Sequence, residues 1–153
     1  MGGLFALCYC IEEKPKVNGL ILSGPAIKAT VAPGAIKTFL LRIAKQFFPS
    51  LCIPFRFSVE YLCSDPEYKR KRSQMALCHA KISLKSGDMM IGMGKEVQGM
   101  QEISFNFPVF GFFGSMDPMI DVESMRETFD KIKTEKIVKE YPGALHEGKT
   151  AIF

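Results

Sequence analysis

The 153-residue sequence has no apolar run that approaches the roughly 20 residues needed to cross a lipid bilayer. Its start also lacks the basic leader and the cleavage-site pattern of a secretory signal. We therefore expect a cytoplasmic protein, or one that is attached peripherally to a membrane.

The cysteines carry no recognisable metal or disulfide pattern. They number five, an odd count, and form no Cys-x-x-Cys pair, which argues against a zinc site and a complete disulfide framework. We interpret them as buried, reduced thiols of an intracellular protein. Neither a metal nor a cofactor is predicted. The five are Cys8, Cys10, Cys52, Cys63 and Cys78.

The composition is typical of a soluble globular domain with one core, since 47% of the residues are hydrophobic and 24% are charged. The net charge of +4 is too small to indicate a face that binds nucleic acid. The excess is concentrated in one basic run, made of Lys69, Arg70, Lys71 and Arg72. Such a run is most often a solvated helix face, and a nuclear localisation signal or a contact with anionic lipid headgroups are the alternatives.

The spacing of the apolar residues predicts an α/β chain. Helices are indicated at residues 4–11 and 122–132, and strands at residues 17–23, 108–113 and 136–141. The last strand is the most polar, so it should lie near an edge of the sheet. Because strands alternate with helices, we expect a parallel sheet that is covered on both faces.

Residues 26–103 are predicted to be a helical insertion without strands. An amphipathic helix is expected at residues 36–47, and Asp65 followed by Pro66 indicates the start of another. A further helix has an apolar stripe that includes Met90, Met93 and Met100. Methionines at this spacing ordinarily belong to a core, but their flexible side chains also suit a funnel for an acyl chain. Both interpretations stay open at this point.

Two residues able to share a proton each follow a predicted strand. Asp117 lies after the strand at residues 108–113, and His146 lies after the strand at residues 136–141. Parallel strands place the loops at their carboxyl ends on the same edge, where a carboxylate can orient an imidazole. From spacing alone, a solvated turn aspartate and an ordinary loop histidine are the alternative. The other histidine, His79, is assigned to packing or to solvent contact.

The sequences around these two residues strengthen the hypothesis. Residues 109–121 read Val-Phe-Gly-Phe-Phe-Gly-Ser-Met-Asp-Pro-Met-Ile-Asp, and residues 139–147 read Lys-Glu-Tyr-Pro-Gly-Ala-Leu-His-Glu. They resemble two segments of the monoacylglycerol lipase and serine aminopeptidase (S33, lysophospholipase-like) group of α/β-hydrolases. The resemblance implies that Asp117 is the acid and His146 the base of a catalytic triad, and that Asp121 is the family's second acid, which begins the next helix.

The same resemblance implies the domain organisation. We expect an α/β fold, the C-terminal half of an α/β-hydrolase sheet with flanking helices, made by residues 1–25 and 104–153. Residues 26–103 would form the helical cap. The expected substrate of a full-length relative is a monoacylglycerol or a lysolipid.

The sequence lacks the Gly-x-Ser-x-Gly pattern that presents the nucleophile of such enzymes. Met1-Gly2-Gly3 resembles the last three residues of the family's Gly-His-Ser-Met-Gly-Gly elbow, which implies that the serine precedes Met1 and that the backbone nitrogen of Met1 belongs to the oxyanion hole. We therefore expect a truncated hydrolase, inactive as given, and favour an incomplete gene model over a genuine short protein. A non-catalytic fragment that binds lipid or a partner is the main alternative, and an unrelated α/β binding domain is the other. The oligomeric state is left open.

Overall fold

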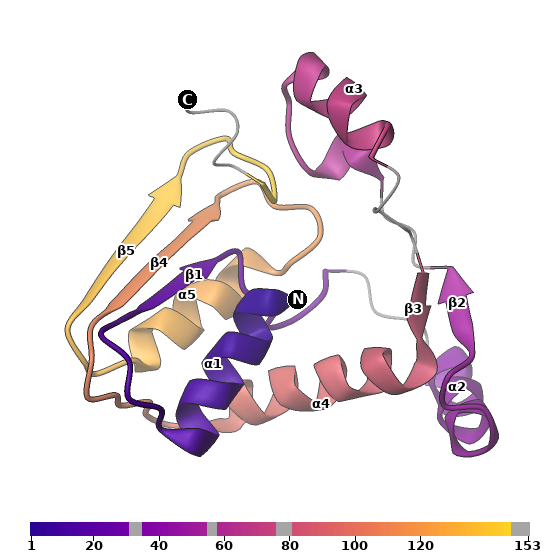
Figure 1. Cartoon of the computed structure of the whole chain (residues 1–153), viewed down its shortest axis with the longest axis horizontal. Helices are drawn as coiled ribbons and strands as arrows, with labels where there is room; N and C mark the ends of the chain where they lie inside the picture. Colours follow the sequence, from indigo (N-terminus) through magenta and orange to yellow (C-terminus); the bar gives the residue numbers. More distant parts are fainter. Residues whose placement is uncertain (31–34, 55–57, 76–80, 148–153) are drawn as a thin grey trace.

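The computed structural model describes residues 1–30, 35–54, 58–75 and 81–147 (Figure 1). The described elements, in chain order, are α1 (Gly2–Glu13), β1 (Leu20–Ser23), α2 (Ala35–Phe47), β2 (Cys52–Pro54), the 3-10 helix η1 (Val59–Tyr61), α3 (Pro66–Ser73), β3 (Lys81–Ser83), α4 (Leu84–Gly99), β4 (Val109–Gly114), α5 (Val122–Lys131) and β5 (Lys136–Tyr141).

The main sheet is parallel and has the strand order β1-β4-β5. Ile21 of β1, Phe110 of β4 and Ile137 of β5 lie opposite one another in register. The polar strand β5 is at an edge, which confirms the prediction from its composition. The carboxyl ends of all three strands therefore point to one edge of the sheet.

One face of this sheet is packed against α1, α4 and α5. Phe113 of β4 stacks on Phe129 of α5 with 5.8 Å between the ring centroids, and Gly111 leaves the space that the Phe129 ring occupies. The shared core includes Leu4, Leu7, Leu22, Val97, Val109, Phe113, Met125 and Phe129.

The other face of the sheet is not covered by any element that the structure describes. On this face Ile21 is 71% exposed and Ile137 is 59% exposed. The expectation of helices on both faces is therefore wrong for the described chain. The alternation of strands with helices predicts a parallel sheet, but it does not say on which face each helix packs.

The insertion does contain strands, contrary to expectation. β2 and β3 pair as an antiparallel ribbon, and each has only three residues with little burial. Strands this short show no alternation of apolar and polar residues, so they could not be predicted from the sequence. The helices that start at Asp65 and Asp121 are confirmed, because both carboxylates accept a hydrogen bond from the first turn of the helix. The division into core and cap stays a prediction, since Val97 at the end of α4 lies in the same core as the sheet.

Candidate active site

Asp117 lies in the turn that follows β4 and is held rigidly. Its Oδ1 accepts hydrogen bonds from the backbone amides of Met119 and Ile120, at 2.8 Å and 3.0 Å. The side chain is fully buried. With one oxygen fixed by two amides, the other oxygen, Oδ2, has a defined direction.

That second oxygen meets His146. The distance from Asp117 Oδ2 to His146 Nδ1 is 2.6 Å, although 29 residues separate the two in the sequence. The imidazole is mostly buried, with 17% of its side chain exposed. A neutral imidazole in this position donates its Nδ1 proton to the carboxylate and keeps a lone pair on Nε2, so it can accept a proton there.

Two hydrogen bonds and one close approach of the backbone hold the histidine loop, residues 142–147, against the turn that carries Asp117. The amide of Met116 donates to the carbonyl of Ala144 at 3.0 Å, and the amide of Gly143 donates to Ser115 Oγ at 2.9 Å. Gly114 allows the approach, because a Cβ there would lie 2.2 Å from the carbonyl oxygen of Ala144. The hydrogen bond from Gly143 to Ser115 was not predicted from the sequence.

The end of β1 and the start of α1 lie at the same edge of the sheet. Gly24 has a φ of +45° and sits beside His146, whose Cε1 would be 3.4 Å from a Cβ at this position. Gly3 in the first turn of α1 is packed against Pro25. The N-terminal end of a helix carries partial positive charge and free amides, which suit a developing oxyanion. The placement of the Met1 nitrogen in such a hole stays a prediction.

Comparison with known proteins now identifies the family. The family model described as serine aminopeptidase, S33, matches residues 1–148. The chain belongs to the serine aminopeptidase S33 family. Comparison of the sequence with curated proteins finds no match.

Solved structures show which fold the chain has. A monoacylglycerol lipase from Paleococcus ferrophilus superposes with a TM-score of 0.85 at 23% identity, over 95% of this chain and 56% of that one. A soluble variant of the Saccharomyces cerevisiae monoglyceride lipase, in complex with a substrate analog, superposes with a TM-score of 0.75 at 19% identity. The match covers 94% of this chain and 53% of that one. A thermostable carboxyl esterase from Bacillus coagulans, in complex with glycerol, superposes with a TM-score of 0.68 at 15% identity. The match covers 95% of this chain and 55% of that one. The fold is therefore that of the α/β-hydrolases, and this S33 chain spans about half the length of these structures.

Met90, Met93 and Met100, the methionines predicted to contact substrate, pack against the core. All three are partly buried and border the cluster formed by α1, α4, α5 and the sheet. This environment favours the interpretation as core residues, and a role toward substrate stays a prediction.

The basic run forms half of α3, and acidic side chains accompany three of its four members. Lys69 pairs with Glu60, Lys71 with Glu67, and Arg72 approaches Glu147 at 3.7 Å. These pairs reduce the positive field of the helix, which favours a solvated face over a binding surface for anions. His79 and Cys78 lie outside the described residues.

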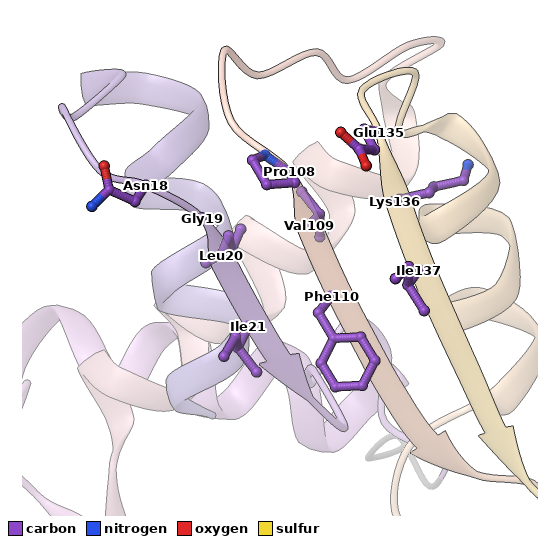
Figure 2. Close-up of a pocket in the computed structure, with 10 residues that line it drawn as sticks. All are labelled: Asn18, Gly19, Leu20, Ile21, Pro108, Val109, Phe110, Glu135, Lys136 and Ile137. Carbon is purple, nitrogen blue, oxygen red and sulfur yellow. The ribbon is translucent and has the colours of Figure 1, made fainter.

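The described part of the S33 chain shows few other candidate sites. None of its helices has the length and apolar character of a membrane span, and none of its His, Cys, Asp and Glu side chains gather in groups of three or more that could hold a metal. A hollow of about 430 Å³ lies on the uncovered face of the sheet. Figure 2 shows that Asn18, Pro108 and Glu135 line it at the start of the three strands. It is thus at the opposite end of the strands from Asp117 and His146.

Proposed function

We propose that this chain supplies the acid and the base of a serine-dependent carboxylic ester hydrolase. The 2.6 Å contact between Asp117 Oδ2 and His146 Nδ1 carries the proposal. His146 would take the proton of a nucleophilic hydroxyl at Nε2 and return it to the leaving alcohol, while Asp117 stabilises the imidazolium. The nucleophilic serine itself would lie outside these 153 residues.

The proposed substrate is a monoacylglycerol or a related lysolipid. Support comes from the fold, which matches the monoacylglycerol lipase from Paleococcus ferrophilus and the monoglyceride lipase from Saccharomyces cerevisiae. A lipid ester is also consistent with a peripheral contact to a membrane. If Lys69 to Arg72 provide that contact, Arg70 would contribute most of the charge, because its three neighbours have acidic partners.

A second candidate is a non-catalytic function in binding a polypeptide partner. The uncovered face of the sheet favours it, because Ile21 and Ile137 expose apolar surface that parallel sheets normally bury. Strand β1 is also an edge strand, with β4 as its one neighbour in the described sheet. A sheet with an open edge and an exposed apolar face can bind a strand or a helix of another polypeptide.

A fluorophosphonate probe tests where the nucleophile lies. The probe reacts covalently with an activated serine, and no serine of this chain is set in a Gly-x-Ser-x-Gly turn. The purified 153-residue chain is therefore expected to remain unlabelled, as judged by intact-mass spectrometry. Covalent modification at any of its serines would contradict this account.

Sequencing the transcript upstream of Met1 separates the two functions. A frame that reads Gly-His-Ser directly into Met1 would complete the elbow, and the longer product is expected to react with the probe and to hydrolyse monoacylglycerol. In that product His146→Ala should abolish both the reaction with the probe and the hydrolysis of monoacylglycerol, since the serine loses its base. A stop codon directly before Met1 would favour the binding function.

A further inference from the structure

The segment of residues 58–75, which holds η1 and α3, is joined to the rest of the molecule next to the candidate base. In Figure 1 α3 lies apart from α2 and α4, on the side of the carboxyl ends of the strands. The amides of His146 and Glu147 donate to the carbonyls of Tyr61 and Leu62, at 3.4 Å and 2.8 Å. The segment therefore holds the backbone of the histidine itself.

Side chains reinforce this backbone pairing. The hydroxyl of Tyr68 donates to Glu147 Oε2, and Arg72 Nη2 lies 3.7 Å from Glu147 Oε1. Tyr68 and Arg72 lie one turn apart on α3, so two side chains of one helix contact the Glu147 carboxylate. Glu147 is 32% exposed and Arg72 is 25% exposed on their side chains, so water screens the ion pair only in part.

His146 is thus held from two directions. Asp117 fixes its ring, and the segment of residues 58–75 fixes its main chain through the amides of His146 and Glu147. A hydrogen bond between ring and carboxylate fixes the direction of Nε2 only if the backbone that bears the ring is also fixed. The position of the base must therefore depend on the docking of α3.

We propose that Glu147 is a positioning residue, which latches α3 onto the histidine loop and thereby sets the position of His146. The inference rests on the proposed role of His146 as a base. It predicts that any change that detaches α3 from the histidine loop also loosens the base.

Alkaline titration tests whether the Tyr68 hydroxyl is engaged. Burial, followed by the hydrogen bond to Glu147, raises the pKa of Tyr68 to about 12. The sequence has no tryptophan to obscure the tyrosinate absorbance, so a step near pH 12 should be visible and should vanish in Tyr68→Phe. Because a free phenol has a pKa of about 10, the bond stabilises the native state fully below pH 10 and is lost as pH rises toward 12. The difference in urea midpoint between the wild type and Tyr68→Phe should shrink over that window.

Hydrogen exchange tests whether the latch holds the base. In Tyr68→Phe the amides of His146 and Glu147 are expected to exchange about 10-fold faster, because a hydrogen bond to a charged group is lost. Glu147→Gln should give a smaller increase, since its amide oxygen still accepts from Tyr68 but has no charge for Arg72. Tyr9→Phe is the matched control, because it removes a hydroxyl from a tyrosine on α1 that is 56% exposed, and it should change neither amide.

The imidazole of His146 supplies the measurement that a purely structural role would not move. Its Nδ1 proton should also exchange about 10-fold faster with water in Tyr68→Phe, as followed by nitrogen-15 NMR of the two histidines. Faster amide exchange with an unchanged imidazole signal would overturn the positioning role, and no change in either would show that the latch is absent. Neither measurement requires hydrolysis, so a failure here is distinct from a failure of the proposed function, which the fluorophosphonate probe reports.

Discussion

Gly114→Ala is expected to separate Asp117 from His146 and to lower the free energy of unfolding by about 2–4 kcal/mol. The new Cβ would lie 2.2 Å from the carbonyl oxygen of Ala144 and 2.4 Å from that of Leu145. Both are backbone atoms, so the histidine loop must retreat by roughly 1 Å to restore ordinary contact. A hydrogen bond of 2.6 Å between the two side chains does not survive such a shift intact.

Urea denaturation measures the loss of stability, and the Nδ1 proton signal of His146 reports the broken contact. Gly92→Ala is the matched control, because nothing lies within 4 Å of a Cβ at that position of α4. There the same substitution should stabilise the helix by up to about 1 kcal/mol. The free energy of unfolding should therefore rise in Gly92→Ala and fall in Gly114→Ala. A Gly114→Ala protein as stable as the wild type would show that the histidine loop does not pack against β4 as described.

The meeting of Asp117 and His146 could be predicted from the sequence. Asp117 and His146 both follow strands that the apolar runs indicate, and parallel pairing then places the two loops on one edge. The short sequences around them carry the resemblance to the S33 group, which the family match confirms. Their 2.6 Å contact follows from strand order rather than from any pattern within either segment.

The contacts that surround this pair were not predictable in the same way. Tyr68 and Glu147 are 79 residues apart and lie in a helix and a loop with no shared periodicity, so only the folded chain brings them together. The uncovered face of the sheet was missed for a related reason. In β1 and β4, the outward-facing Ile21 and Phe110 alternate with buried residues. Both faces of these strands are therefore apolar, and the sequence of such a strand is the same whether or not a helix covers its second face.

Asp117→Asn is expected to reverse the protonation of His146 with little loss of stability. The asparagine oxygen can still accept from the amides of Met119 and Ile120, as the carboxylate does at 2.8 Å and 3.0 Å. Its amide nitrogen, however, is a donor and faces His146 Nδ1. The imidazole must then accept at Nδ1 and carry its proton on Nε2, the nitrogen that has to be free to act as a base.

Nitrogen-15 NMR of the neutral imidazole distinguishes the two tautomers directly in the 153-residue chain. Asp121→Asn is the matched control: it lies four residues further on, caps α5 through the same kind of bond to the Ser124 amide, and should leave the His146 tautomer unchanged. In a product that contains the elbow serine, Asp117→Asn should lower kcat by about 10⁴-fold, whereas Asp121→Asn should not. If the proton stayed on Nδ1 in Asp117→Asn, the carboxylate would not be what orients the imidazole, and the assignment of Asp117 as the triad acid would fail. The tautomer thus links the one distance on which the proposed chemistry depends to a measurement that needs neither substrate nor serine.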